Sequence, residues 1–239
     1  MRIGVFDSGI GGLTVLAEII RRVPFGDCLY YADNKNAPFG EKSADKITEY
    51  LDSALKFFKA DGADAAVIAC NTLSMLAEPF KSRFPFKIIT TLPPVEKSEN
   101  PQKTLLLATP FTVSALTEKG LPEGLKAYGI PEIVPLLERA APDFTRAYPL
   151  LRKFLPKDCG FTEVILGCTH YPYFKCLAKT LYPCARITDG GLDAAEKLLS
   201  VARGKAKPEK FPEIRFCFTG ADKTALYGEI LNRLLAENE

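Results

Sequence analysis

Short apolar runs alternate with segments of helical periodicity along almost all of the 239-residue chain. Runs rich in β-branched residues and bounded by Gly, Pro or Asp predict strands. The predicted strands are Ile3–Phe6, Cys28–Ala32, Ala65–Cys70, Lys87–Thr90, Thr104–Thr109, Glu132–Pro135, Glu163–Cys168, Arg186–Thr188 and Ile214–Phe218. The predicted helices are Thr14–Arg22, Ser43–Ala60, Leu73–Arg83, Val113–Lys119, Ala141–Leu155, Tyr173–Leu181, Leu192–Ala202 and Ala221–Ala236. This alternation predicts parallel sheets flanked by helices, which is the α/β class.

A proline-rich segment divides the chain. Pro93, Pro94 and Pro101 lie between residues 92 and 102, and the same strand–helix alternation begins again after them. Such a cluster is typical of a loop rather than of a helix or strand. We therefore expect an internal boundary at this segment.

Two cysteines each end an apolar run and are followed at once by hydrogen-bonding residues. Cys70 precedes Asn71 and Thr72, and Cys168 precedes Thr169 and His170. Each cysteine is expected at the carboxyl end of a parallel strand, where open α/β sheets place their chemistry. The two segments resemble each other, which predicts a site between two similar halves with one sulfur on each side of a ligand.

Composition excludes several classes of partner. Charged residues make up 25% of the chain and the net charge is +2, so we expect no nucleic-acid partner. No apolar stretch approaches the roughly 20 residues that span a membrane, so we expect no membrane partner.

The chain reads from its first residue into a strand rather than a signal peptide, and its seven cysteines include no CxxC pair. Reduced thiols and a cytoplasmic location are expected. A single histidine argues against a zinc site, and we predict no metal.

Two chemical readings of the cysteines remain open. A lone activated cysteine with a histidine base would indicate a thiol hydrolase. Two matched cysteines instead suggest that one sulfur removes a proton and the other returns one. Preorganised donors must then stabilise the charge that develops beside a carboxylate. Asp7 and His170 are candidates to tune the two sulfurs.

Cysteine is among the most buried residue types, so each of the two taken singly would be interpreted as a core residue. As a matched pair with polar residues after them, a functional role is favoured. The other cysteines are predicted to be core or incidental surface thiols: Cys28, Cys159, Cys176, Cys184 and Cys217.

A glycine-rich segment follows the first predicted strand. Glycines at positions 9, 11 and 12 allow a tight turn and a close approach to a ligand. The segment lacks both the GxGxxG spacing and the Walker lysine, so a dinucleotide or P-loop site is disfavoured.

Motifs along nearly the whole chain resemble those of glutamate racemase, in the aspartate/glutamate racemase superfamily. They are Asp7-Ser8-Gly9-x-Gly11-Gly12, Pro38-Phe39-Gly40, Cys70-Asn71-Thr72, Thr109-x-x-Thr112, Val134-Pro135-Leu136-Leu137-Glu138, Gly167-Cys168-Thr169-His170-Tyr171-Pro172 and Phe218-Thr219-Gly220. The resemblance implies two similar α/β lobes with mainly parallel sheets and the active site in the cleft between them. Residues 1–93 plus 189–239 would form the first lobe, and residues 94–188 the second.

The resemblance also implies an activity. The family interconverts L- and D-glutamate without a cofactor and supplies D-glutamate for peptidoglycan, so the expected partner is a small-molecule substrate. A homodimer is left open. The implied catalytic residues are Cys70, Cys168, Asp7 and His170. The implied substrate-binding residues are Asp7, Ser8, Phe39, Gly40, Asn71, Thr72, Thr169 and His170. Asp33 and Glu138 are interpreted either as remote polar supports or as ordinary loop charges.

The chain departs from the family pattern at three places. Phe39 stands where tyrosine is usual, Leu73 where alanine is usual, and Gly190 where serine is usual. These departures bear on substrate preference and rate, since none removes a proposed catalytic group. An aspartate or other amino-acid racemase and a catalytically silent racemase-like binding protein therefore remain as alternatives.

Overall fold

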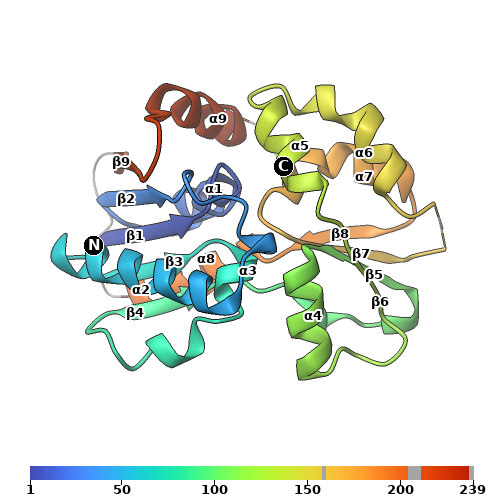
Figure 1. Cartoon of the computed structure of the whole chain (residues 1–239), viewed down its shortest axis with the longest axis horizontal. Coiled ribbons are helices and arrows are strands. Elements are labelled where there is room, and N and C mark those ends of the chain that lie inside the picture. Colours follow the sequence, from blue (N-terminus) through green and yellow to red (C-terminus); the bar gives the residue numbers. More distant parts are fainter. Residues whose placement is uncertain (158–159, 204–210, 237–239) are drawn as a thin grey trace.

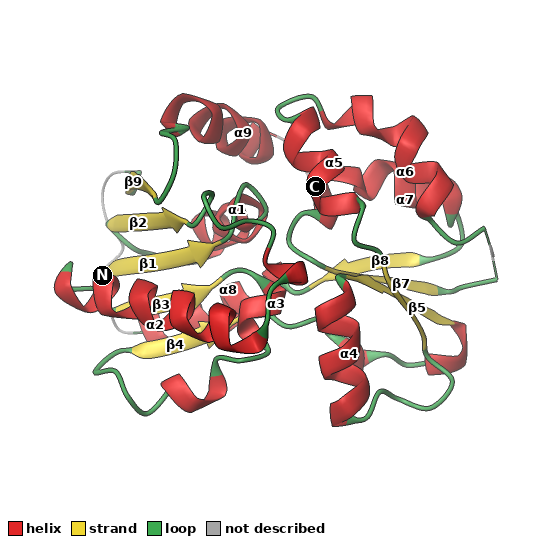
Figure 2. Cartoon of the chain, viewed as in Figure 1, coloured by secondary structure: helices red, strands yellow, loops and turns green. Residues whose placement is uncertain are grey.

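The computed structural model describes residues 1–157, 160–203 and 211–236. These residues form two lobes that lie side by side, each built on one sheet with helices packed against it (Figures 1 and 2). The first sheet has the strand order β4-β3-β1-β2-β9, and the second has the order β6-β5-β7-β8. Every strand pair is parallel. The α/β class and the two lobes are confirmed, and both sheets are wholly rather than mainly parallel.

The elements have the following bounds. The first sheet consists of β1 (Arg2–Asp7), β2 (Asp27–Ala32), β3 (Ala65–Ile68), β4 (Lys87–Thr90) and β9 (Glu213–Phe218). The second consists of β5 (Thr104–Ala108), β6 (Lys126–Gly129), β7 (Glu163–Gly167) and β8 (Arg186–Asp189). The α-helices are α1 (Gly12–Arg22), α2 (Ala44–Ala60), α3 (Asn71–Ser74), α4 (Pro110–Lys119), α5 (Ile133–Ala140), α6 (Tyr148–Phe154), α7 (Lys175–Leu181), α8 (Gly191–Ala202) and α9 (Thr224–Ala236).

The first sheet is buried on both faces because its strands are apolar on both faces. Ile3 and Val5 of β1 pack in one hydrophobic cluster with residues of α1, α8 and α9. Phe6 packs in a second cluster with residues of α2. Alternate side chains of a strand point to opposite faces, so one strand contributes to both layers. Continuous burial of this kind is typical of parallel sheets.

The chain crosses between the lobes twice. It leaves the first sheet after β4 and returns from β8 into α8, which packs against α1. The two crossing segments touch at Gly190, where a Cβ atom on that residue would lie 2.5 Å from the carbonyl oxygen of Leu92. β9 then adds to the edge of the first sheet beside β2. The exact lobe boundaries stay a prediction.

The second lobe differs from the sequence prediction at two elements. The strand predicted over Glu132–Pro135 is wrong, because this segment lies at the start of α5, whose buried residues Ile133, Val134 and Leu137 have helical spacing. A four-residue apolar window cannot distinguish the two periods. The edge strand of the second sheet is instead β6, where only Ala127 is partly buried and no apolar run marks the strand.

Prolines shorten two predicted helices. The helix expected over Leu73–Arg83 is only the short α3, followed by a 3-10 turn that contains Pro79. The one expected over Ala141–Leu155 is a 3-10 turn followed by α6, which has Pro149 in its first turn. Proline lacks the backbone N–H that a helix interior requires. None of the described helices combines the length and the hydropathy needed to cross a membrane.

Candidate active site

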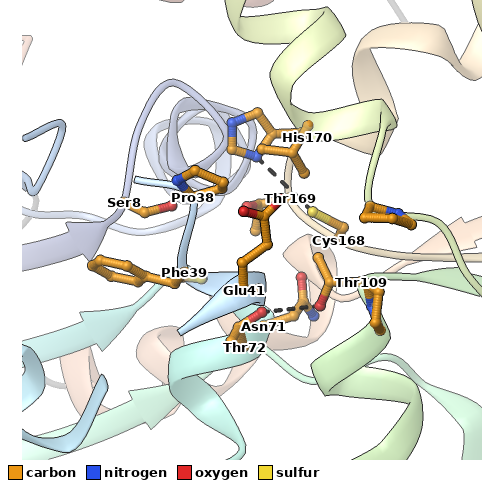
Figure 3. A pocket seen from close by; sticks show the side chains of 15 residues that line it. Ser8, Pro38, Phe39, Glu41, Asn71, Thr72, Thr109, Cys168, Thr169 and His170 are labelled. Carbon is orange, nitrogen blue, oxygen red and sulfur yellow. Dashed lines mark hydrogen bonds between the residues drawn. The ribbon is translucent and has the colours of Figure 1, made fainter. Parts of the chain in front are cut away.

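Strands of both sheets end at one pocket between the lobes (Figure 3). Cys70 follows β3 and Thr109 follows β5, and each occupies the N-cap position of the next helix. Cys168 directly follows β7. The residues that line the pocket are Ser8, Pro38, Phe39, Gly40, Glu41, Cys70, Asn71, Thr72, Thr109, Pro110, Pro131, Val134, Cys168, Thr169 and His170. One sulfur therefore comes from each lobe.

Behind Cys168, the ionisable side chains of His170 and Glu138 follow one another in a line, which we call the charged line. Its sulfur lies 3.9 Å from Nδ1 of His170 (Figure 3), and Nε2 of His170 lies 2.8 Å from Oε1 of Glu138 on α5. Burial lowers the pKa of His170, but the bonds to Cys168 and Glu138 outweigh burial and raise it well above the usual value. His170 therefore bridges the sulfur of Cys168 and the carboxylate of Glu138, and its raised pKa favours the protonated ring.

Cys70 has the opposite electrostatic surroundings. Burial and the negative charge of Asp7 raise the pKa of the Cys70 thiol well above its usual value, although the backbone N–H groups of Leu73 and Thr72 oppose the rise. Cys70 is therefore held as the neutral thiol. The two sulfurs of the pocket therefore have different neighbours: Cys70 lies beside the anion Asp7, and Cys168 lies beside the cation His170.

Asp7 lies behind the lining residues and joins the two lobes. It is fully buried, its Oδ1 accepts the N–H of Gly9 at 2.8 Å, and its Oδ2 accepts the hydroxyl of Thr169 at 3.2 Å. Burial raises its pKa from 3.8 to about 6, and the charge of His170 limits the rise. A carboxylate with a pKa close to neutrality is suited to exchange a proton with a thiol.

The rest of the lining includes one carboxylate, that of Glu41, and several neutral polar groups. Ser8, Asn71 and Thr72 are all buried, and the amide of Asn71 donates to the carbonyl of Thr91 at 3.0 Å. No lysine or arginine is found among the described lining residues. A bound carboxylate would therefore rely on hydroxyl, amide and backbone N–H donors, together with the His170 cation.

A cluster of three threonine hydroxyls adds Thr109 and Thr112, which the predicted site omitted, to the predicted residue Thr72. Thr72 of the first lobe lies 3.1 Å from Thr109 of the second (Figure 3), and Thr109 lies 2.9 Å from Thr112. All three are buried. The motif Thr109-x-x-Thr112 is visible in the sequence, but its contact with Thr72 requires the two lobes to meet. Glu138 is likewise recognisable in the sequence, but its contact with His170 is not.

Two departures from the family pattern lie away from the polar centre of the site. The ring of Phe39 stacks on Tyr50 with centroids 5.4 Å apart and meets Phe6 edge-on, so it packs into the first lobe. Leu73 is fully buried in the same hydrophobic cluster and is not among the lining residues. Phe39 therefore lines the pocket while its ring packs on the first lobe, whereas Leu73 belongs to the core beside it.

The other cysteines differ in burial. Cys28 is buried, Cys217 is half-buried, and Cys176 and Cys184 are exposed. Cys159 lies outside the described residues. Within the described part of the chain, no three His, Cys, Asp or Glu side chains are grouped so as to hold a metal ion.

The fold and the site define a class of protein: a two-lobed α/β protein whose pocket presents a thiol from each lobe. No protein-family model matches the chain. It is, however, 36% identical to the glutamate racemase of Campylobacter concisus, over 93% of this chain and 91% of that protein. The glutamate racemase of Thermus thermophilus in complex with β-chloro-D-alanine superposes with a TM-score of 0.81 at 30% identity, covering 99% of this chain and 93% of the other.

A third comparison agrees. The Escherichia coli glutamate racemase, solved with L-glutamate and the activator UDP-MurNAc-Ala, has a TM-score of 0.78 at 26% identity over 98% of this chain and 94% of the other. The chain therefore belongs to the glutamate racemase family.

Proposed function

We propose that this protein interconverts L- and D-glutamate by two-thiol proton transfer and so supplies D-glutamate for peptidoglycan. The observation that carries the proposal is the pair of sulfurs in one pocket, Cys70 beside an anion and Cys168 beside a cation. A reaction that removes a proton from one face of a carbon and adds one to the other needs one base and one acid at the same time.

In the direction from L- to D-glutamate, the Cys168 thiolate removes the α-proton and leaves a carbanion. The Cys70 thiol then donates its proton to the opposite face. Afterwards Cys168 is a thiol and Cys70 a thiolate, so the reverse reaction starts with the roles exchanged. His170 and Asp7 are the groups beside the sulfurs that can return the protons between turnovers.

The α-proton of an amino acid is only weakly acidic, so the carboxylate next to it must be stabilised as the carbanion forms. Asn71, Thr72 and Thr169 are buried donors on the same pocket, and we propose that they bind the substrate together with Ser8. The backbone at Phe39 and Gly40 completes the proposed binding set.

The first test is proton NMR of L- and D-glutamate incubated with the protein in D₂O without an added cofactor. We expect the α-proton signal of both enantiomers to disappear and the optical rotation to decay to zero. Binding without loss of the signal would favour the silent binding protein, and faster exchange of aspartate would favour an aspartate racemase. A covalent adduct at one cysteine would favour a thiol hydrolase.

Replacing either sulfur should then separate the two roles. Cys70→Ser and Cys168→Ser should each lower racemisation by about 10²- to 10⁴-fold, the usual contribution of a general acid or base. Because the enantiomers have equal free energy, kcat/KM must be equal in both directions, so rates alone cannot assign the sulfurs.

The primary deuterium isotope effect can assign them, since only the abstracted proton carries the label. In Cys168→Ser the effect on kcat/KM should rise for α-deuterated L-glutamate and fall toward one for the D-enantiomer. In Cys70→Ser it should change in the opposite sense. Near-normal turnover in either variant would rule out the two-base assignment.

A further inference from the structure

One residue of the first lobe is held at both of its backbone polar atoms by the second lobe. The N–H of Ile10 donates to Oε1 of Glu138 at 3.0 Å, and the carbonyl of Ile10 accepts the hydroxyl of Tyr173 at 2.7 Å. Ile10 lies in the glycine-rich segment of residues 7–12, which we call the glycine loop. This loop also carries Asp7 and Ser8, so its position sets part of the site.

The carboxylate that holds Ile10 is the same one that holds His170. Oε1 of Glu138 lies within hydrogen-bond distance of both the Ile10 N–H and Nε2 of His170. Burial opposes the shift, but the His170 bond and the Ile10 N–H together keep the pKa of Glu138 below its usual value. A displacement of the glycine loop would therefore change the charged line that ends at Cys168.

The backbone of the glycine loop lies very close to the side chains of Glu138 and His170. A Cβ atom at Gly9 would lie 2.0 Å from Oε1 of Glu138, and one at Gly11 would lie 2.4 Å from Nδ1 of His170. Both distances are far below van der Waals contact, so only glycine allows the backbone to approach the second lobe at these two positions.

Tyr173 itself is firmly placed. Its ring stacks on Phe144 with centroids 3.9 Å apart and an interplanar angle of 17°, and its carbonyl accepts the hydroxyl of Tyr148 at 3.3 Å. It is buried but is not among the residues that line the pocket. Tyr173 can therefore act on the reaction only through the groups that it holds.

We propose that Tyr173 is a positioning residue, which fixes Ile10 so that Glu138, His170 and Cys168 stay aligned for proton transfer at Cys168. The inference rests on the proposed two-thiol function. It predicts an asymmetric effect, because the bond from Tyr173 reaches Glu138 and His170 through Ile10. Asp7, the charged neighbour of Cys70, is the last residue of β1 and stays paired with β2.

The test compares Tyr173→Phe with Tyr182→Phe in the full chain. The hydroxyl of Tyr182 donates to the carbonyl of Pro156 at 2.7 Å, so the control loses a bond of the same type in the same lobe, away from the pocket. Tyr173→Phe should lower kcat/KM about three- to tenfold, the loss expected for one buried hydrogen bond. Tyr182→Phe should leave it unchanged.

Two readouts distinguish positioning from a general loss of stability. In Tyr173→Phe the deuterium isotope effect should rise for α-deuterated L-glutamate and fall toward one for D-glutamate. Amide hydrogen exchange of residues 8–12 should also become faster in Tyr173→Phe only, since the glycine loop loses the bond at the Ile10 carbonyl. Equal isotope effects in the two directions, or exchange equal to that of Tyr182→Phe, would overturn the proposal.

The same experiment separates this proposal from the function on which it rests. A wild-type protein that does not racemise glutamate would overturn both the proposed function and the positioning role. A wild-type protein that racemises glutamate, with Tyr173→Phe matching it in rate and isotope effects, would overturn the positioning role alone.

Discussion

At the scale of single residues, Asp7 contributes to the site at a cost in stability. The carboxylate is fully buried beneath the pocket, and burial raises its pKa from 3.8 to about 6. Because the protonated form is favoured in the folded protein, its contribution to stability is complete below about pH 4 and is lost as the pH rises through about 6. The full loss is about 3 kcal/mol at neutral pH.

Asp7→Asn should remove this pH dependence. An amide can keep the bond from the Gly9 N–H and carries no charge, so the variant should gain stability relative to wild type as the pH rises from 4 to 7, by at most about 3 kcal/mol. Its racemisation should fall, since an amide cannot exchange a proton with Cys70. Urea unfolding at both pH values measures the difference. A difference between the two proteins that is constant with pH would contradict the assignment.

At the scale of elements, the second lobe depends on helix α5, whose first residues the sequence pattern predicts as a strand. As a helix it brings Glu138 to the glycine loop and to His170 while burying Ile133, Val134 and Leu137. The motif that contains Glu138 is recognisable in the sequence, but its role depends on the helical conformation.

The contact between the two crossing segments leads to a prediction at the same scale. In Gly190→Ala the new Cβ would meet the carbonyl of Leu92 at 2.5 Å, and backbone atoms cannot move aside like a flexible side chain. We expect a loss of about 1–3 kcal/mol in the free energy of unfolding, as for other overpacked sites. Gly26→Ala is the matched control, since nothing lies within 4 Å of its Cβ position. Equal urea midpoints for the two variants would show that the crossing segments tolerate the methyl group.

At the scale of the whole molecule, the site exists only where the lobes meet. Thr169 contacts Asp7, Ile10 contacts Glu138, and Thr72 contacts Thr109, so each of these bonds joins the two lobes. Substrate affinity should therefore depend on how well the lobes hold together as well as on the groups that touch the ligand.

Thr109→Val tests this dependence. Valine keeps the shape but removes the hydroxyl that bonds Thr72 and that also bonds Thr112 at the N-cap of α4. KM for glutamate should therefore rise by at least about three- to tenfold, the equivalent of one hydrogen bond. Thr109→Ser should restore the wild-type KM. Thr117→Val is the control on the same helix, where the exposed hydroxyl bonds only within α4. Steady-state kinetics with both enantiomers measures KM, and an unchanged KM in Thr109→Val would contradict the prediction.

The sequence by itself determined the α/β class, most strands of both sheets and the two cysteines of the pocket. These features depend on local patterns: β-branched runs, helical periodicity and motifs at strand ends. It also identified Asp7, His170 and the glycine loop, because each adjoins a strand end.

Only the tertiary structure decided which groups meet. The link from Glu138 to His170, the threonine cluster and the Tyr173–Ile10 bond join residues that are 32, 37 and 163 positions apart. The conformation of α5 and the edge strand β6 also depended on packing, since their short segments lack a decisive period. Local residue patterns place each group on its element, whereas the contacts between two lobes arise only when the chain crosses from one sheet to the other and back.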